Sequence, residues 1–215
     1  MIKQKYICKC KHFDFSKKNF AYWEEKIITT DEKDVIEYLE KKSNFSSKNI
    51  LHIGIGNSYF AKKFFNLNEI VGLSISNSEI NLARNLDIKN YKTFYCDKYS
   101  INFNDLLKNF TFDYIIDTNL KSYSCCNESF YYYFSNLSKL LKPEGAIITS
   151  NDGMKWFKKL VPKLTFNLKN FFHYKLKEIK GDNSNIFSKN DVNNICKEYS
   201  LKFTELEKIS YFERK

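Results

Sequence analysis

Short apolar runs alternate with amphipathic stretches along the chain from about residue 30 to residue 150. The apolar residues of 31–42 recur at helical spacing with charges between them, so a helix that starts at Thr30 or Asp31 is predicted. Residues 49–56 form a short apolar run that ends in glycines, which predicts a buried parallel strand. Further strands are predicted over 69–74, 91–96, 112–117, 146–150, 202–207 and 209–213. Further helices, with their caps, are predicted over 57–65, 76–86, 128–141 and 188–199.

This alternation predicts the class of fold. Repeated strand–helix units give a parallel sheet with helices on both faces. With seven predicted strands, we expect an α/β chain of three αβα layers around a doubly wound, mostly parallel sheet. No internal repeat or linker marks a second domain. Within the single domain 1–215 we distinguish an N-terminal segment (1–45), a core (46–150), an insert (151–187) and a C-terminal helix with strands (188–215).

Composition agrees with one folded domain. A length of 215 residues is close to the usual domain size of roughly 100–200 residues. Hydrophobic residues make up 43% and aromatic residues 17%, which excludes wholesale disorder. No apolar run approaches the roughly 18 residues that a membrane span needs, and the start lacks the features of a signal peptide. We therefore expect a soluble, cytoplasmic protein without a membrane partner.

The net charge of +10 raises the question of a nucleic-acid partner. Nearly all of the positive charge is lysine, since the arginines are Arg84 and Arg214. Nucleic-acid sites favour arginine for its bidentate hydrogen bonds, and the lysines here are spread along the chain without a dense block. An AT-rich genome also enriches its proteins in Lys, Asn, Ile, Phe and Tyr, which are all abundant here. A nucleic-acid partner is therefore the less favoured interpretation.

Six cysteines stand at positions 8, 10, 96, 125, 126 and 196, and we expect them to be reduced thiols. The sequence Cys8-Lys9-Cys10-Lys11-His12 has the residue types of a metal site. It lacks the C-x₂₋₄-C spacing of common zinc sites, and no second ligand pair is evident downstream. We therefore predict no metal site.

Ligands of parallel α/β sheets bind beyond the carboxyl ends of the strands, near the point where the strand order reverses. The first predicted strand leads into Gly54, Ile55, Gly56, Asn57 and Ser58. Glycines in such a turn let a ligand approach the backbone, and the following helix directs free N–H groups at it. The next residue is a tyrosine where a dinucleotide fingerprint has its third glycine, so a plain tight turn is the alternative.

Four segments, taken together, carry a resemblance to a known family. They are 50–58 (ILHIGIGNS), 95–97 (YCD), 112–117 (FDYIID) and 140–148 (LLKPEGAII). In order and spacing they resemble the motifs of the class I, Rossmann-like, S-adenosylmethionine-dependent methyltransferases, and the turn into the fifth strand is that family's most recognisable feature. The resemblance covers about residues 35–150. It implies the fold expected above, enzymatic methyl transfer and S-adenosyl-L-methionine as the cofactor.

The resemblance also implies where the cofactor binds. Its candidate residues lie after the predicted strands or among the N-terminal aromatics: His52, Gly54, Gly56, Asn57, Ser58, Ser74, Ile75, Cys96, Asp97, Asp117, Asn119, Tyr22 and Trp23. Asp97 matches the acid that accepts a hydrogen bond from the adenine amine in that family.

Two positions depart from the family pattern. Ser74 stands where an acid normally binds the ribose hydroxyls, and a hydroxyl forms a weaker hydrogen bond than a carboxylate. The fatty-acid cyclopropane synthases also have a hydroxyl residue there, although nothing else here indicates a lipid substrate. His52 stands where an acid is common. A neutral imidazole could accept a hydrogen bond from the methionine amino group, and a histidine packed inside the sheet is the alternative.

Contacts to the methyl acceptor are expected after the fourth strand, as in the resembled family. Asp117 and Lys121 are the candidate catalytic residues, while a strand-end acid that holds a backbone turn is an equal interpretation of Asp117. Residues 117–126 lack the N/D-P-P-Y/F motif of amino-methylating nucleic-acid enzymes. Cys125 and Cys126 lack the preceding proline of cytosine-C5 enzymes, so packing against the sheet is preferred to a nucleophilic role.

Two aromatic segments flank this region. Tyr22 and Trp23 suit a lid over a sulfonium through cation–π attraction, and an ordinary amphipathic helix is the alternative. The aromatic residues of 151–185 either form the acceptor pocket or cap the sheet.

Three functions follow from these observations. A methyltransferase of small polar molecules is preferred, because the chain has one domain and no RNA-binding appendage. The net charge favours an RNA methyltransferase, and Ser74 with His52 favours a non-catalytic domain that keeps the fold. The sequence determines neither the methylated atom nor the oligomeric state.

Overall fold

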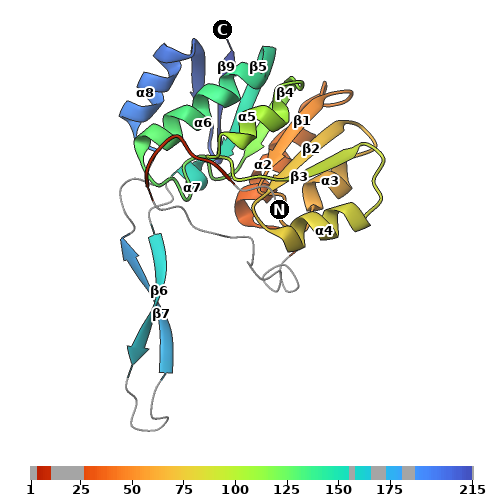
Figure 1. The fold of residues 1–215 in the computed structure, drawn as a ribbon. Helices are drawn as coiled ribbons and strands as arrows, with labels where there is room; N and C mark the ends of the chain where they lie inside the picture. Colours follow the sequence, from red (N-terminus) through yellow and green to blue (C-terminus); the bar gives the residue numbers. More distant parts are fainter. Residues whose placement is uncertain (1–3, 11–26, 155–157, 166–172, 181–186, 215) are drawn as a thin grey trace.

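The structure is a computed structural model, and its described residues are 4–10, 27–154, 158–165, 173–180 and 187–214. Within this part of the chain, Figure 1 shows a central sheet with helices on both faces. The sheet has seven strands in the order β3-β2-β1-β4-β5-β9-β8. Their bounds are β1 (Asn49–Ile53), β2 (Glu69–Ser74), β3 (Tyr91–Tyr95), β4 (Phe112–Asp117), β5 (Leu141–Ser150), β8 (Leu201–Glu205) and β9 (Ile209–Arg214).

Strand pairing confirms the predicted doubly wound, mostly parallel sheet. Strands β1 to β5 pair in parallel, and β9 pairs antiparallel with both β5 and β8. The order reverses between β1 and β4, because the chain moves outward from β1 to β3 and then returns. The loops after β1 and β4 therefore lie side by side at the edge where the parallel strands end. We call this the carboxyl edge.

Helices form the two outer layers. One face carries α2 (Thr30–Glu40), α3 (Tyr59–Phe64) and α4 (Asn77–Asn85), and the other carries α5 (Asn102–Leu107), α6 (Asn127–Leu140) and α8 (Lys189–Glu198). Each face has its own buried core, the first with Val35, Phe60 and Ile80, the second with Phe103, Phe134 and Ile195. None of the helices in the described part of the chain is long and apolar enough to cross a membrane.

The strand sequences explain why both faces are covered. Successive side chains of a strand point to opposite faces. In β1, Ile50 lies in the core of the α2 face and Leu51 in the core of the α6 face, and both are fully buried. A continuous apolar run therefore requires helices on both sides, which is why such runs predict parallel strands.

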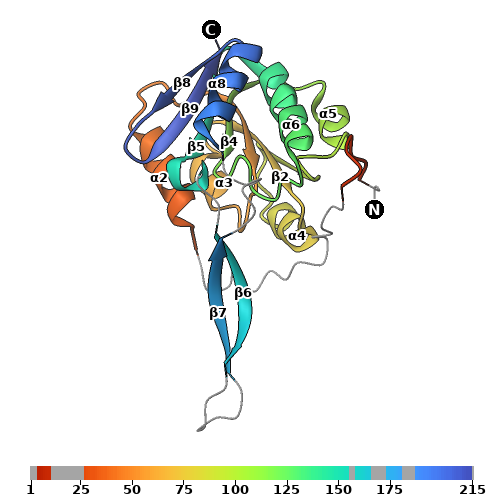
Figure 2. The same ribbon diagram turned by 90° about the vertical axis from the view of Figure 1, so that its left-hand side faces the viewer.

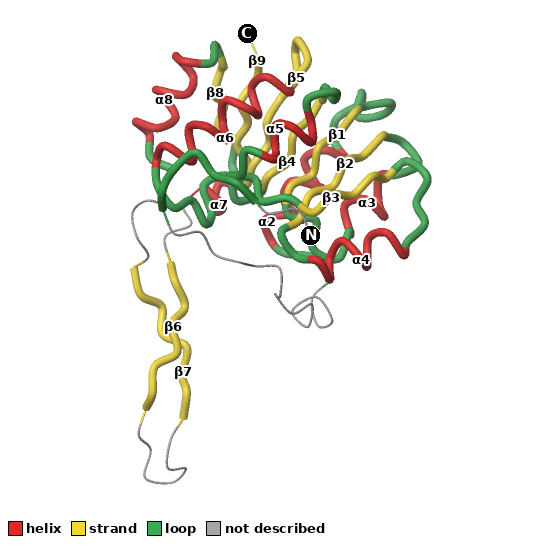
Figure 3. Tube along the Cα trace, viewed as in Figure 1, coloured by secondary structure: helices red, strands yellow, loops and turns green. Residues whose placement is uncertain are grey.

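The structure corrects several predicted boundaries. Strand β5 begins at Leu141 rather than at residue 146, because residues 142–145 form an irregularity between the Phe112–Leu141 and Tyr114–Ala146 pairs. Helices α5 and α7 (Asn151–Met154) were not predicted, since six and four residues are too few to show a helical period. The predicted insert contains β6 (Lys158–Thr165) and β7 (His173–Lys180), an antiparallel pair that extends away from the sheet (Figures 2 and 3).

Helix α7 packs directly on the backbone that follows β4. A Cβ added to Gly153 would lie 1.6 Å from the carbonyl oxygen of Thr118 and 2.8 Å from its carbonyl carbon. Main-chain atoms cannot rotate away as a side chain can, so a larger residue at this position requires the two segments to separate.

We therefore predict that Gly153→Ala lowers the free energy of unfolding by about 1–3 kcal/mol, the usual cost of overpacking. Urea denaturation measures this. Asp152→Ala is the control, because Asp152 is exposed in the same short helix. Equal stability of the two variants would contradict the close packing of α7.

Candidate functional site

The carboxyl edge includes a glycine turn after β1. Gly54 and Gly56 have φ angles of +80° and +51°, which side chains disfavour. The N–H of Gly54 donates to the carbonyl oxygen of Leu73 at 2.8 Å and so ties the turn to the end of β2. A Cβ on Gly54 would meet no atom within 4 Å among the described residues. The turn therefore presents its backbone to open space, as binding of a ligand against the backbone requires.

The next two residues turn their side chains toward the protein. The Asn57 amide donates to the carbonyl oxygen of Ile27 at 2.7 Å, and its Oδ1 accepts from the N–H of Tyr59 at 3.1 Å. Ser58 is fully buried, with its hydroxyl 3.1 Å from that of Tyr91. These two predicted cofactor residues therefore hold the turn in place, and what they offer a ligand is their backbone.

A carboxylate reaches the end of β2 from a neighbouring helix. The hydroxyl of Ser74 donates to Oε2 of Glu79 at 2.6 Å and accepts from the N–H of Ser76 at 2.9 Å, and all three residues are buried. Glu79 belongs to the first turn of α4, five residues beyond Ser74. Sequence reasoning missed Glu79, although the spacing Ser76-x-x-Glu79 is that of a helix capping box and was visible. The predicted residue Ile75, next to Ser74 in the sequence, is half-buried.

Asp97, after β3, is in contact with residues 4–10, which we call the N-terminal strap. Oδ2 of Asp97 accepts from the hydroxyl of Tyr6 at 2.9 Å, and its Oδ1 accepts from the N–H of Tyr99 at 2.9 Å. Lys5 anchors the strap further, because its carbonyl oxygen accepts from the N–H of Ile101 at 2.7 Å. The strap runs along the carboxyl edge toward the start of α6 (Figure 1). It therefore forms one wall of any pocket at the end of β3.

Cys96 lies behind Asp97 and remains a neutral thiol. It is buried, and its thiol donates to the carbonyl oxygen of Asp97 at 3.3 Å. Burial raises the pKa of Cys96 to about 12, helped by the charge of Asp97.

A buried ion pair joins the ends of β3 and β4. Nζ of Lys98 lies 2.7 Å from Oδ2 of Asp117, and the hydroxyl of Tyr133 donates to the same oxygen at 2.7 Å. Oδ1 of Asp117 accepts from the N–H of Asn119 at 3.0 Å. Asp117 is 2% exposed, and Lys98 is 9% exposed. Asp117 thus holds a backbone turn, which is one of the two roles considered from sequence.

The other candidate catalytic residue, Lys121, lies on a different side of this loop. Its Nζ is 3.0 Å from Oδ2 of Asp191, at the start of α8, and 5.1 Å from the centre of the Phe130 ring. Lys121 is 2% exposed. The structure therefore pairs Asp117 with Lys98 and Lys121 with Asp191, and it does not pair the two candidates with each other. Asn119 does lie at the carboxyl edge, and its side-chain amide donates to the Thr118 hydroxyl at 3.2 Å.

His52 faces a buried glutamate rather than a ligand. Its Nε2 lies 3.9 Å from Oε1 of Glu32, a residue of α2, and its ring packs on Phe60. Burial lowers the pKa of His52 to about 4 and raises the pKa of Glu32 to about 7. The N–H of Phe60 donates to Glu32 and partly offsets that rise in pKa. Glu32 thus connects α2 to the first turn of α3, directly after the glycine turn. Sequence reasoning missed it, because it lies on another helix.

Two of the predicted cofactor residues, Tyr22 and Trp23, lie outside the described residues, so the predicted lid stays a prediction.

Comparisons with known proteins show the fold. No protein-family model matches the chain, and no curated protein matches it significantly in sequence. Among solved structures, CalS10 with S-adenosylmethionine bound, an amino pentose methyltransferase from Micromonospora echinaspora, is 12% identical with a TM-score of 0.57, covering 85% of this chain and 89% of CalS10. The N-methyltransferase NodS from Bradyrhizobium japonicum WM9, in complex with S-adenosyl-L-homocysteine, is 14% identical with a TM-score of 0.56, covering 91% and 97%. PH0226 from Pyrococcus horikoshii OT3 is 19% identical with a TM-score of 0.55, covering 91% and 99%. The chain therefore has the Rossmann-like methyltransferase fold, as its motifs implied.

The Lys98–Asp117 pair yields a prediction on stability. Lys98→Met should lower the free energy of unfolding by about 3–5 kcal/mol, because it leaves Asp117 buried without its counter-charge. The double variant Lys98→Met/Asp117→Asn should lose less than the sum of the two single variants.

Urea denaturation of the wild type and the three variants measures this coupling. Lys142→Met is the matched control, because Lys142 lies at the same distance of 2.7 Å from Asp113 but in a more exposed pair, where about 1 kcal/mol or less is expected. Additive effects at positions 98 and 117 would contradict the coupling.

Glu32 and His52 yield a prediction on pH dependence. Glu32 ionises near pH 4.5 when unfolded and near pH 7 when folded, so the folded protein holds an extra proton between these values. Glu32 therefore makes the free energy of unfolding fall as pH rises through that window. His52 has the opposite effect between about pH 4 and pH 6.5, where the unfolded chain binds the extra proton.

The Glu32→Gln substitution removes the fall in the free energy of unfolding that Glu32 causes as pH rises. The free energy of unfolding of this variant minus that of the wild type should increase between pH 4.5 and pH 7. We expect an increase of roughly 1–3 kcal/mol. Urea denaturation at several pH values measures the difference. A difference between Glu32→Gln and the wild type that stays constant with pH would show that the carboxyl group of Glu32 does not titrate in this window.

Proposed function

We propose that this protein is an S-adenosyl-L-methionine-dependent methyltransferase that acts on a small polar molecule. The observation that carries the proposal is the order of groups along the carboxyl edge. The glycine turn follows β1, the Ser74–Glu79 pair lies at the end of β2, and Asp97 follows β3. On this fold, these three successive places suit the methionine, ribose and adenine parts of the cofactor.

The residues present fit these parts chemically. The open side of Gly54 allows the methionine part to lie against the backbone of the turn. Glu79 supplies the carboxylate that Ser74 lacks, so the ribose hydroxyls would donate to a charged acceptor. Asp97 already accepts two hydrogen bonds, and a carboxylate has about four acceptor positions, which leaves room for the adenine amine.

Glu32 and Glu79 weaken the case for a non-catalytic domain. That interpretation rested on His52 and Ser74, which stand where the resembled family has acids. In the structure, a carboxyl group lies beside each of them, Glu32 within 3.9 Å of His52 and Glu79 within 2.6 Å of Ser74. At the end of β2, a carboxylate from a helix therefore takes the place of the strand-end acid, while at β1 the carboxyl group of Glu32 is buried beside His52.

The reaction requires positioning more than acid–base chemistry. When bound, the cofactor supplies a methyl group on a sulfonium, and an acceptor in line with that bond displaces it. The task of the protein is to orient the acceptor and exclude water. In this proposal Asp117 is a positioning residue, because it fixes the backbone of Asn119 at the acceptor side. A neutral amine acceptor needs no general base for the attack itself, and the proposal assigns none.

A small acceptor is supported by the nature of the similar structures. CalS10 is an amino pentose methyltransferase and NodS an N-methyltransferase, and each matches this chain over most of its own length. The net charge of +10 favours RNA as a second candidate acceptor. RNA binding that weakens steeply with salt, together with methyl transfer to RNA, would select this alternative.

Calorimetry with S-adenosyl-L-homocysteine tests the cofactor site. The wild type should bind it, and Asp97→Asn and Glu79→Gln should each weaken binding by about 1–3 kcal/mol, because each removes a charged acceptor while keeping the shape of the side chain. Glu69→Gln is the control, since Glu69 is exposed at the opposite end of β2.

No binding to the wild type at millimolar concentration would overturn the proposal. Binding that is unchanged in Asp97→Asn and Glu79→Gln, with thermal unfolding also unchanged, would show that the adenine and ribose lie elsewhere.

A further inference from the structure

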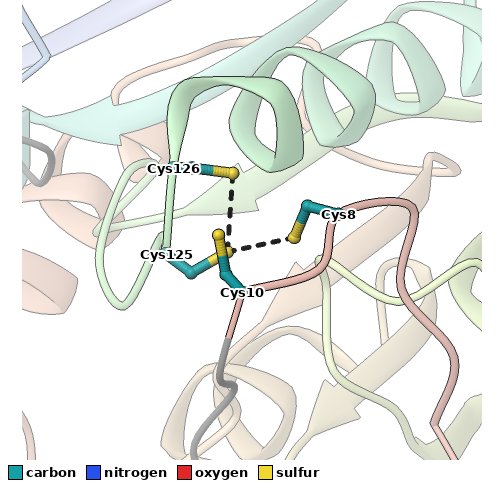
Figure 4. A group of neighbouring side chains, drawn as sticks. All are labelled: Cys8, Cys10, Cys125 and Cys126. Atoms are coloured by element: carbon teal, nitrogen blue, oxygen red, sulfur yellow. Dashed lines mark hydrogen bonds between the residues drawn. The ribbon is translucent and has the colours of Figure 1, made fainter.

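Four of the six cysteines meet at one point outside the proposed cofactor contacts. Cys8 and Cys10 belong to the N-terminal strap, and Cys125 and Cys126 to the loop between β4 and α6. Their four sulfur atoms all lie within 4.8 Å of one another. Figure 4 shows the four side chains directed toward a common point. Cys8 and Cys125 are separated by 117 positions in the sequence.

The sequence alone predicts no metal site here, because Cys8-x-Cys10 lacks the C-x₂₋₄-C spacing of common zinc sites and no second ligand pair is evident downstream. Cys125 and Cys126 are that second pair, and tertiary structure rather than local spacing brings them to the first.

The distances suit a single tetrahedral metal ion. Zinc–sulfur bonds of about 2.3 Å in a tetrahedron place the sulfur atoms about 3.8 Å apart. Sγ of Cys8 lies 3.4 Å from Sγ of Cys125, which lies 3.7 Å from Sγ of Cys126. An iron–sulfur cluster is wider, because several metal atoms separate its cysteines. A set of four thiolates selects zinc among the common divalent ions.

The backbone on both sides of the group is already held in place. Lys5 and Tyr6 tie the strap to the segment after β3, with the Tyr6 hydroxyl 2.9 Å from Asp97 and the Lys5 carbonyl oxygen 2.7 Å from the N–H of Ile101. On the other side, the hydroxyl of Ser124 donates to the carbonyl oxygen of Cys126 at 2.8 Å. The ligands are thus presented by two fixed segments, which lowers the entropy that metal binding must overcome.

The position of Cys126 favours its thiolate, and the exposure of the group argues against simple packing. Cys126 is the N-cap residue of α6, a helix of 14 residues whose amino end stabilises negative charge. Cys10 is exposed and the other three are half-buried, whereas cysteines that serve as small hydrophobic residues are usually buried. An ion from solvent can reach the group.

We propose that Cys8, Cys10, Cys125 and Cys126 bind one zinc ion in a closed, structural site. The four thiols release their protons to solvent as the thiolates coordinate the ion, and no electron is transferred. All four positions are filled by protein, so the ion has no open position for a substrate or water. Its role is to fasten the strap to the loop after β4, across the carboxyl edge. This proposal does not depend on the proposed function.

Metal analysis of the full chain, purified with reductant and without added chelator, tests the site. We expect one zinc per chain, and Co²⁺ added to the metal-free wild type should give the intense visible bands of tetrahedral thiolate coordination. The Co²⁺ spectrum needs no variant, so it stays informative even where a substitution prevents folding.

Variants locate the ligands. Cys8→Ser and Cys125→Ser should lose most of the zinc, while Cys196→Ser, at a half-buried cysteine outside the group, should keep it. Removal of zinc by a chelator should lower the thermal unfolding temperature of the wild type and of Cys196→Ser.

Several results would overturn the zinc site. They are a reduced wild type that binds neither Zn²⁺ nor Co²⁺, iron in place of zinc in the protein as purified, or equal zinc loss in Cys196→Ser. Binding of S-adenosyl-L-homocysteine, measured in parallel, keeps the outcome for zinc separate from the outcome for the methyltransferase.

Discussion

The buried ion pair of Lys98 and Asp117 determines how the carboxyl edge is built. Lys98 directly follows Asp97 after β3, and Asp117 ends β4, while β2 and β1 lie between these two strands in the sheet. Nζ of Lys98 also donates to the carbonyl oxygens of Asn119 and Leu120 at 2.8 and 3.2 Å. One ammonium group therefore sets the course of the loop after β4. A buried charge without a partner is energetically unfavourable. This contact therefore holds the segment after β3 and the loop after β4 in a fixed relative position.

Carboxylates at this edge come partly from helices instead of strand ends. Glu79 reaches Ser74 from α4, and Glu32 reaches His52 from α2. The supply of a carboxyl group by a helix has different consequences at β2 and at β1. At β2 it leaves a charged acceptor beside a hydroxyl, which suits a ligand rich in hydroxyl groups. At β1 the pair is buried, with the His52 ring packed on Phe60, so its role is to join the glycine turn to the helices around it.

The N-terminal strap connects the proposed cofactor site with the cysteine group. Tyr6 contacts Asp97, and two residues further on Cys8 lies 3.4 Å from Cys125. Whatever fixes the cysteines therefore also fixes the side chain that borders Asp97. The proposed zinc ion would add to the hydrogen bonds of Lys5 and Tyr6 in fixing this segment.

The sequence by itself determined the fold class, the order of most elements and the positions at or just after the end of each strand, Gly54, Ser74 and Asp97 among them. These properties are local, since hydrophobic period, glycine turns and caps are set within a few residues. Only the tertiary structure decided which side chains meet at those positions. Glu79 beside Ser74, Lys98 beside Asp117 and the four cysteines are contacts between different elements. These contacts depend on the order of the strands in the sheet and on the packing of the connecting helices. Both are set by the burial of apolar surface over the whole chain.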